Sequence, residues 1–348
     1  VSPQWLPDSR HLLFVSDREG ARGVYVVELD RGGAVGSPKP VPGAVDPHSI
    51  SVSANGKRLA YSRYTVRQNV WRIPVAGLGT VSMHRDLASA VPITTGNHVI
   101  EAFDLSPDGA WIAFDNYRRG EFDIYRQRLG GGEPELVADI DGHAYAPLWS
   151  PDGTELLFDG GLTSDVFVVS ANGGTPQKLV DKPGQDGWPL WAPDGLSIVY
   201  RSWKHEPGSP RGYRLWRVVR ERVGAPWNPP VKISERRCAY HTWMPDGQNL
   251  LCVLGDEWTV LSIDGESRGT LDRPTGMESV QHPQFSPDGS RLYFRGIHED
   301  GREGIWWMPA RGGELTLAVA FDDPSVGIGS IQHRDDVVIL AFNETESD

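Results

Sequence analysis

Short apolar runs with a period of two recur along the chain, and turn residues bound each of them. Residues 111–114 read WIAF, residues 123–126 read DIYR and residues 165–168 read DVFV. A period of two places alternate side chains on opposite faces of a β-strand. The pattern therefore predicts short antiparallel strands joined by tight turns along most of the sequence.

One ten-residue pattern repeats through the chain. LSPDGAWIAF (105–114) returns as WSPDGTELLF (149–158), WAPDGLSIVY (191–200), WMPDGQNLLC (243–252) and FSPDGSRLYF (285–294), with weaker copies WLPDSRHLLF (5–14) and VSANGKRLAY (52–61). In such a turn Pro fixes the first position, Asp bonds to the backbone two residues on, and Gly adopts the left-handed conformation. The turns recur every 42 to 53 residues. This period, with several short strands per unit, predicts an all-β propeller of four-stranded antiparallel blades.

The number of units predicts eight blades, of which the last is incomplete. Seven complete units begin near residues 1, 48, 101, 145, 187, 239 and 281, and a decayed copy, SIQHRDDVVILAF (330–342), belongs to a unit that begins near 327. Because the first unit already has four strands, we expect it not to absorb the last two. Seven blades with an extra hairpin are the alternative. In both cases residues 1–348 are predicted to form a single propeller domain.

Aromatic residues recur three positions before the marker Asp of the turn. They are Trp5, Trp149, Trp191, Trp243 and Phe285. Because they keep register with the repeat, we expect their rings to fill the wedge between neighbouring blades rather than to form a ligand cage.

Composition narrows the classes of function. The chain has 40 Gly and 27 Pro, which disfavour long helices, and a formal net charge of −12, which disfavours binding to nucleic acid. The longest apolar run, VVILAF (337–342), is too short for a membrane helix. The two cysteines, Cys238 and Cys252, lack CxxC spacing and are interpreted as buried free thiols.

The blade formula resembles the TolB-type propeller family over essentially the whole chain. Residues 50–75 (ISVSANGKRLAYSRYTVRQNVWRIPV) are similar to a blade of bacterial propellers joined to winged-helix regulators or membrane-anchored serine/threonine kinases. The ending, FDDPSVGIGS (321–330) and LAFNETESD (340–348), resembles the last blade of the kinase-linked group. The resemblance implies a C-terminal sensing or interaction module on the extracytoplasmic side of a bacterium, with a cytoplasmic location left open. The chain begins at Val1 rather than Met, and we expect it to be part of a longer protein.

Sequence signatures of catalysis are incomplete in these residues. The chain has no HRDxxxxN kinase loop, no DFG, no Walker loop and no HExxH, and its one GxSxG match, GESRG (265–269), lies among predicted strands and turns rather than at a strand-to-helix turn. We therefore predict no catalytic residue and no cofactor, and interpret the chain as a recognition module for a protein, peptide or small-molecule ligand. Its oligomeric state is not predicted.

Candidate ligand-binding residues lie six or seven positions before the turn marker. There the first strand of a blade reaches the central channel, and polar and aromatic groups from several blades converge on one mouth. The candidates are His48, Glu101, Tyr145, Trp188, Tyr240 and His282.

Two enzymatic alternatives remain open at this stage. A looser resemblance extends to oligogalacturonate lyases, in which His and Gln hold a channel metal, and His48, Glu101 and His282 would be the ligands here. The chain would then be a metal-dependent lyase or hydrolase acting on an anionic saccharide. Since His282 is several blades from the other two, we predict no metal site. A weaker alternative is the substrate gate of a peptidase.

A second candidate surface comes from the loops between second and third strands, which return to the same mouth. The second unit supplies Arg63, Tyr64 and Arg67, and the fifth supplies Arg201, Trp203 and Lys204. Basic residues beside aromatic ones are typical of contacts with a protein partner.

Overall fold

The structure is a computed structural model of the chain. It describes residues 3–16, 18, 22–44, 47, 49–62, 64–74, 80–95, 98–118, 120–180, 185–203, 212–286, 288–322, 328–334 and 337–347. The chain divides into two compact units, Val1–Arg67 with Glu344–Asp348, and Gln68–Asn343. Each unit is considered separately below.

The larger unit is built of antiparallel sheets whose strands pair in chain order. Four sheets have four strands each: β10 (Phe103–Leu105), β11 (Trp111–Arg118), β12 (Glu121–Arg128) and β13 (Glu135–Ala138); β14 (Ala144–Trp149), β15 (Glu155–Gly160), β16 (Asp165–Ser170) and β17 (Gln177–Lys178); β18 (Gln185–Trp191), β19 (Ser197–Trp203), β20 (Arg214–Val219) and β21 (Val231–Arg237); β22 (Tyr240–Trp243), β23 (Asn249–Leu254), β24 (Glu257–Ser262) and β25 (Ser267–Thr270). A fifth sheet holds β26 (Met277–Phe285), β27 (Arg291–His298), β28 (Glu303–Pro309) and β29 (Thr316–Ala320), with β8 (Val81–Ser82) parallel to β29. These sheets confirm the predicted four-stranded antiparallel repeat.

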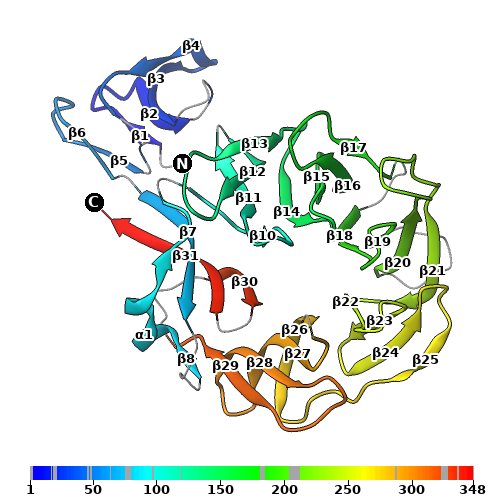
Figure 1. Cartoon of the computed structure of the whole chain (residues 1–348). Helices are drawn as coiled ribbons and strands as arrows, with labels where there is room; N and C mark the ends of the chain where they lie inside the picture. Colours follow the sequence, from blue (N-terminus) through cyan, green and yellow to red (C-terminus); the bar gives the residue numbers. More distant parts are fainter. Residues whose placement is uncertain are drawn as a thin grey trace. The chain divides into compact units, whose positions relative to one another are not determined.

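Within this unit the sheets follow one another around a ring, with the first strand of each sheet toward the centre (Figure 1). First strands of successive sheets are in contact, as β10 is with β14 and β22 is with β26. The only helices in the described part of the chain are the short α1 (Met83–Asp86) and the 3-10 turn η1 (Leu87–Ser89). No described helix has the length and apolarity required to span a membrane.

A sixth sheet, most of whose residues belong to the larger unit, combines strands from two distant parts of the sequence. Its order is β30 (Ile328–Arg334), β31 (Val337–Ser347), β7 (Tyr64–Pro74) and β9 (Val91–Pro92). The C-terminal hairpin thus pairs with the third strand of the second repeat, although we expected it to form an incomplete blade of its own. Two strands alone are marginally stable and leave edges unpaired, which explains why the hairpin joins a larger sheet.

The smaller unit holds the rest of the first two repeats. β1 (Gln4–Trp5), β2 (His11–Ser16), β3 (Gly23–Asp30) and β4 (Gly33–Val41) form a four-stranded sheet, and β5 (Ser49–Val52) pairs with β6 (Leu59–Ser62) alone. The second repeat is therefore divided between two sheets. The predicted count of eight blades, or seven, is not confirmed, and a single domain over residues 1–348 stays a prediction.

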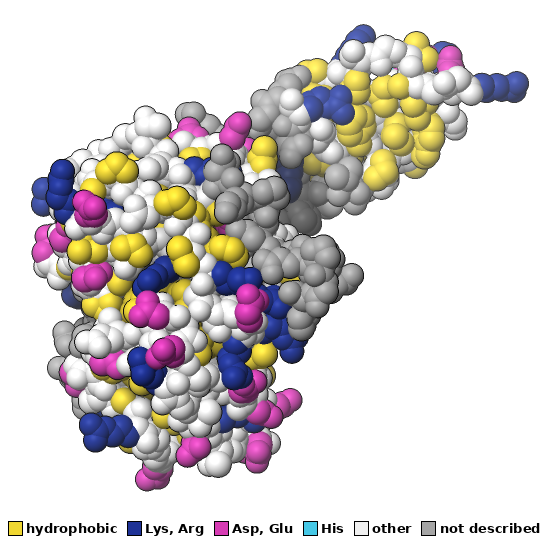
Figure 2. All heavy atoms as spheres, turned by 90° about the vertical axis from the view of Figure 1, so that its right-hand side faces the viewer, with side chains coloured by type: hydrophobic (Ala, Val, Ile, Leu, Met, Phe, Trp, Pro, Cys, Tyr) yellow, Lys and Arg dark blue, Asp and Glu magenta, His cyan; other side chains and the backbone are white. Residues whose placement is uncertain are grey.

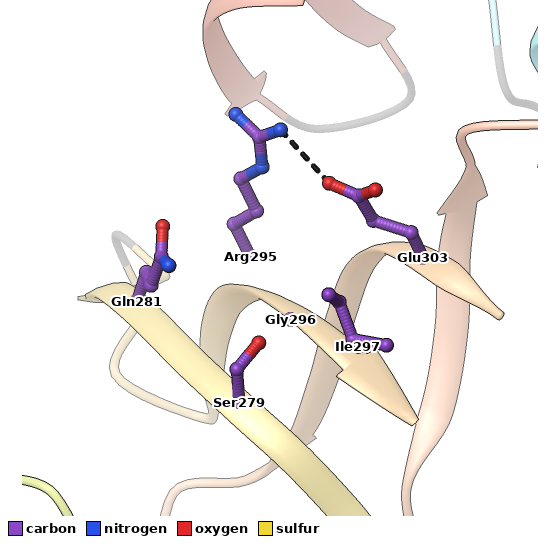
Figure 3. Close-up of a pocket in the computed structure, with 6 residues that line it drawn as sticks. All are labelled: Ser279, Gln281, Arg295, Gly296, Ile297 and Glu303. Atoms are coloured by element: carbon purple, nitrogen blue, oxygen red, sulfur yellow. Dashed lines mark hydrogen bonds and ion pairs between the residues drawn. The ribbon is translucent and has the colours of Figure 1, made fainter. Parts of the chain in front are cut away.

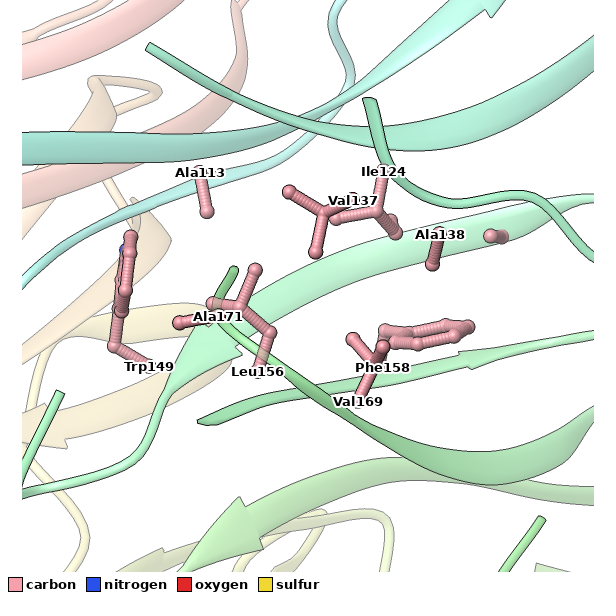
Figure 4. Close-up of a cluster of buried hydrophobic side chains, with 10 residues drawn as sticks. Ala113, Ile124, Val137, Ala138, Trp149, Leu156, Phe158, Val169 and Ala171 are labelled. Atoms are coloured by element: carbon pink, nitrogen blue, oxygen red, sulfur yellow. The ribbon is translucent and has the colours of Figure 1, made fainter. Parts of the chain in front are cut away.

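The interface between adjacent sheets of the larger unit is filled as the repeat predicted. The cluster in Figure 4 joins Ala113 and Ile124 of one sheet to Trp149 and Phe158 of the next. Trp149 is 7% exposed, and its backbone N–H donates to Asp104 Oδ2 of the preceding sheet at 2.8 Å. The aromatic position of the repeat therefore both excludes water and fixes one sheet against its neighbour.

The other aromatic residues of this position differ in burial. Trp191 is buried and donates from Nε1 to Leu148 O of the preceding sheet at 3.3 Å, while Trp243 and Phe285 are partly buried against core clusters. Trp5, in the smaller unit, is 57% exposed. The prediction that this position is core is thus confirmed in the larger unit and wrong at Trp5, whose strand β1 has only two residues.

The turn that marks each repeat has the predicted chemistry. In the third repeat Gly109, with φ of 69°, donates its N–H to Ser106 O, and Asp108 accepts from the Ser106 hydroxyl and the Ala110 N–H. These hydrogen bonds lower the pKa of Asp108. The Asp of the turn is therefore structural, as expected.

The two cysteines are joined, which corrects their interpretation as free thiols. Cys238, just before β22, forms a disulfide with Cys252 of β23, and their Cα atoms are 5.5 Å apart. Pairing of His241 with Cys252 across the β22–β23 hairpin brings the two sulfurs together. The spacing of the two cysteines in the sequence does not show that they are close, because their distance depends on the register of the hairpin.

Charges of both signs are mixed on the outer surface of the larger unit. In the view of Figure 2, Lys and Arg side chains alternate with Asp and Glu, and apolar side chains lie between them. No continuous basic area appears on that face.

Burial predicts a large loss of stability for one substitution and a small loss for another at the same repeat position. We expect Trp149→Ala to lower the free energy of unfolding by about 3–5 kcal/mol, because it empties a buried wedge. The matched change Trp5→Ala removes an exposed ring and should cost less than about 1 kcal/mol. Urea unfolding followed by far-ultraviolet circular dichroism measures both. An equal loss in the two variants would contradict the assignment of this wedge.

Candidate functional site

The first strands of three sheets share an irregularity at the inner end of the larger unit. Ala146 of β14, Trp188 of β18 and His282 of β26 have φ angles of 51°, 49° and 50°, and the strand register shifts at each of them. Residues other than glycine seldom adopt this left-handed backbone, and a bulge of this kind re-aims the side chain. Trp188 and His282 are two of the residues predicted to bind ligand.

A buried carboxylate of the preceding sheet holds the first of these bulges. Asp115 of β11 accepts from the N–H groups of Glu101 and Ala102 at 2.7 and 2.9 Å, and from that of Ala146 in the next sheet at 3.1 Å. Burial raises the pKa of Asp115 to about 7 in spite of these donors. Asp115 therefore fixes the position of one sheet relative to the next.

Asp159 of β15 occupies the equivalent position in the following sheet. It accepts from the backbone N–H of Trp188, and its Oδ1 is buried with no hydrogen-bond partner among the described residues. Burial raises the pKa of Asp159 to about 7, and Arg201 opposes this rise. The carboxyl is thus poised to gain or lose a proton near neutral pH.

Arg201 of β19 takes the same position in the third sheet and lies among aromatic rings. Its guanidinium carbon is 3.1 Å from the ring centre of Trp188 and 4.4 Å from that of Tyr213. The ring of Tyr240, in the next sheet, is 6.0 Å away. Arg201 is only 6% exposed, and burial lowers its pKa to about 10. These contacts are cation–π interactions in a partly desolvated setting, where they are strongest.

The aromatic cluster, defined as Trp188, Tyr213, Tyr240 and His282, spans three sheets around this guanidinium. Tyr240 and His282 meet edge to face at 4.9 Å, and Trp188 contacts both, at 6.0 and 5.7 Å. His282 is exposed at the surface, but desolvation by these rings, with the charges of Arg201 and Arg295, lowers its pKa. A neutral imidazole is therefore expected at pH 7.

A small polar cavity adjoins His282 in the same sheet. It has a volume of about 70 Å³ and is lined by Ser279, Gln281, Arg295, Gly296, Ile297 and Glu303 (Figure 3). Arg295 lies beside Gln281 across the β26–β27 pair and forms an ion pair with Glu303 at 2.8 Å. The cavity thus offers hydrogen-bonding groups with balanced charge.

The opposite side of the inner end is acidic. Glu101, Asp115 and Asp159 all raise the pKa of Tyr145, after the larger effect of burial. The Tyr145 ring also packs against Phe122 and His143, at 4.9 and 5.5 Å. The candidate site therefore has a cationic aromatic half and an acidic half, which meet where Asp159 and Arg201 influence one another.

The structure places the predicted ligand-binding residues in two groups. Trp188, Tyr240 and His282 are brought into direct contact, and Glu101 and Tyr145 lie close together on the acidic side. His48 lies outside the described residues. Three of the six predicted residues are therefore in direct contact, and the role of the six in ligand binding stays a prediction.

The predicted partner-contact residues have a different setting. Arg201 and Trp203 were expected in a loop, but both lie in β19, where Arg201 is buried and Trp203 is 38% exposed. Strand β19 extends three residues beyond the ten-residue pattern, which the repeat alone did not show. Arg63 and Lys204 lie outside the described residues, as do the side chains of Tyr64 and Arg67 in β7.

Sequence reasoning also missed three residues of the site, namely Asp115, Asp159 and Tyr213. A signal for two of them exists, because Asp115, Asp159, Arg201 and Arg295 all directly follow the aromatic residue that closes the ten-residue pattern. This position carries a charged residue in four repeats and reaches toward the neighbouring sheet in at least three. Within the described residues, no three His, Cys, Asp or Glu side chains gather as a metal site would require.

Comparisons with known proteins agree with this architecture. Residues 79–217 match the family described as the TolB beta propeller domain. An uncharacterized protein of Agrobacterium fabrum is 31% identical over 106 residues, which are 30% of this chain and 33% of that relative. The match therefore spans about a third of the relative's length.

Three solved structures extend the similarity in fold. A protein assigned as TolB from Agrobacterium tumefaciens has a TM-score of 0.53 at 18% identity and covers 81% of this chain and 99% of its own. A puromycin-hydrolyzing peptidase of Mycobacterium tuberculosis has a TM-score of 0.52 at 14% identity, covering 98% and 56%. An oligogalacturonate lyase of Vibrio parahaemolyticus has a TM-score of 0.50 at 12% identity, covering 97% and 88%. The chain has a TolB-like propeller fold, one that occurs in binding proteins and enzymes alike.

The raised pKa of Asp159 predicts a dependence of stability on pH. Because the native pKa is about 7 and the ordinary value is 3.8, the native state holds the extra proton between these values. Stability contributed by this group therefore falls as the pH rises through that window. Asp159→Asn still accepts from Trp188 N–H but cannot ionise, so we expect it to remove up to about 4 kcal/mol of the decline.

Urea unfolding of wild type and variant from pH 4 to pH 8 measures this effect. Asp152→Asn, in the turn of the same repeat, is the matched control. The pKa of Asp152 is lowered, so its carboxyl does not titrate in this pH range. Parallel curves for wild type and Asp159→Asn would contradict the assigned burial of the carboxyl.

Proposed function

We propose that the chain is a non-catalytic recognition module which binds a protein, peptide or small ligand at the inner end of its larger unit. The observation that carries this proposal is the aromatic cluster around Arg201. Three rings from two sheets lie within 6.0 Å of one guanidinium, the His282 ring of a third sheet contacts two of them, and Trp188 is 43% exposed. Exposed aromatic residues beside arginine are typical of binding surfaces, because they bury much area at little cost in side-chain entropy.

Backbone geometry supports the same location. Trp188 and His282 both have the left-handed backbone that costs free energy for residues other than glycine. Such conformations cluster at sites where a side chain must point in a specific direction. Since these two residues also touch, at 5.7 Å, the bulges hold an interacting pair at the surface.

In the parent protein the module would act as a sensor or scaffold of bacterial signalling. This part rests on two resemblances: that of residues 50–75 to propellers joined to winged-helix regulators or receptor-like serine/threonine kinases, and that of residues 321–330 and 340–348 to the kinase-linked group. An extracytoplasmic location follows from the same resemblances. The catalytic or output domain would lie in another part of that parent.

Two alternatives use the same fold. A lyase or hydrolase acting on an anionic saccharide would use His48, Glu101 and His282 as metal ligands. The similarity in fold to an oligogalacturonate lyase supports this alternative. A gate for a peptidase is the other, given the similarity to a puromycin-hydrolyzing peptidase. For the lyase, no three His, Cys, Asp or Glu side chains gather among the described residues, and His48 lies outside them.

Selection from a random peptide library displayed on phage tests the proposal. We expect peptides enriched on the wild-type chain to lose about tenfold or more in enrichment on Trp188→Ala, because truncation of a central aromatic residue removes a binding hot spot. Leu162→Ala, which shortens another exposed apolar side chain, should leave enrichment unchanged.

Two results would overturn the proposal. One is that no peptide distinguishes wild type from Trp188→Ala. The other is turnover of oligogalacturonate by the purified chain, with bound metal that is lost in His282→Ala, which would favour the lyase.

A further inference from the structure

Three arginines are buried in the described part of the chain, and two of them have a carboxylate partner. They are Arg201, Arg214 and Arg220. Arg220 lies against the contacting rings of Trp191 and Trp227, with its guanidinium carbon 5.4 and 4.5 Å from the ring centres. Its Nη1 and Nη2 donate to the two oxygens of Glu155 at 2.9 and 2.6 Å. Arg214 has Glu235 at 3.8 Å.

Arg201 has the same aromatic setting as Arg220 but lacks the carboxylate. Trp188 and Tyr213 stack on its guanidinium at 3.1 and 4.4 Å. Among the described residues it makes no ion pair, and its Nε is buried without a hydrogen-bond partner. Asp159 is near enough to influence its pKa but accepts no hydrogen bond from it. A buried guanidinium in this state is costly, since an unpaired charge loses its hydration without compensation.

We propose that a carboxylate of the ligand supplies the missing partner, so that Arg201 anchors an anionic group within the aromatic cluster. This inference rests on the proposed function and names the chemistry of its ligand. The N–H groups of a guanidinium lie in its plane, and a planar carboxylate fits their edge with two parallel hydrogen bonds. The Arg220–Glu155 pair shows the same geometry elsewhere in this chain.

The surroundings favour a singly charged ligand with an apolar neighbour. His282 has a lowered pKa and adds no positive charge at pH 7, and Arg295 is already paired with Glu303 at 2.8 Å. One unpaired cation therefore remains among the described residues of the cluster. The exposed ring of Trp188 offers an apolar face directly beside it.

Calorimetric titration with matched probes tests the proposal and separates possible sources of the carboxylate. One pair is acetyl-Ala-Ala-Phe with a free C-terminus and the same peptide as its amide. A second pair is acetyl-Ala-Glu-Phe-amide and acetyl-Ala-Gln-Phe-amide. A third pair is digalacturonate and its methyl ester. We expect the acid in at least one pair to bind about tenfold or more tightly than its neutral partner, and that pair identifies the source.

Substitutions of Arg201 connect this preference to the guanidinium. Arg201→Met should abolish the difference between acid and neutral probe, and Arg201→Lys should retain only part of it, because an ammonium lacks the planar fork. Arg291→Met is the matched control, since Arg291 also stacks on a ring, Trp307 at 4.2 Å, but is exposed. It should leave the preference unchanged.

The stability of the ligand-free protein gives a second readout. If the place of the carboxylate is empty, Arg201→Met removes an unpaired buried charge and should keep or raise the urea midpoint. A lowered midpoint together with an unchanged preference for acids would mean that Arg201 is structural, and the proposal would be wrong.

The remaining outcomes separate this proposal from the proposed function. If no acid is preferred at concentrations up to about 10 mM, the carboxylate anchor is wrong and the recognition site remains. The same holds if acid and neutral probes bind equally and both lose binding in Trp188→Ala. If selected peptides bind Trp188→Ala as well as wild type, the recognition site itself is wrong.

Discussion

Each sheet of the larger unit must bury its face against the next sheet, and the rest of the structure depends on this constraint. In the core, Trp149 packs on Ala113 of the preceding sheet, and its backbone N–H donates to Asp104 of that sheet. At the inner end the same constraint is met by the residue that follows the second-strand aromatic. Asp115 and Asp159 use that position to bind the backbone of the following sheet. The candidate site is therefore made from the contacts that join the sheets.

Arg201 occupies that inter-sheet position with the opposite charge, and this explains the character of the site. A carboxylate there can accept backbone N–H groups of the next sheet, whereas a guanidinium cannot, because it only donates. Arg201 instead meets the face of Tyr240 at 6.0 Å, and its hydrogen bonds are not used within the described residues. A position that is structural in two sheets thereby becomes available for a ligand in the third.

Much of this architecture could be predicted from the sequence, because local chemistry determines it. The turns depend on Ser, Asp and Gly within five residues, and register with the turn correctly grouped Trp188, Tyr240 and His282. What failed depended on strand pairing and strand length. The C-terminal hairpin joined β7, Cys238 met Cys252 across a hairpin, and the extra length of β19 buried Arg201. None of these pairings leaves a mark in local composition.

The most direct test of the account is to observe the Arg201 guanidinium itself. With ¹⁵N-labelled arginine side chains, its Nε–H resonance in a nuclear magnetic resonance spectrum can be assigned by its disappearance in Arg201→Lys. The account predicts that this resonance moves when the preferred carboxylate probe is added and stays in place with the neutral probe. Arg220, which already holds Glu155, should not move with either. An Arg201 resonance that does not shift when the carboxylate probe is added, or that shifts equally with the neutral probe, would contradict the account.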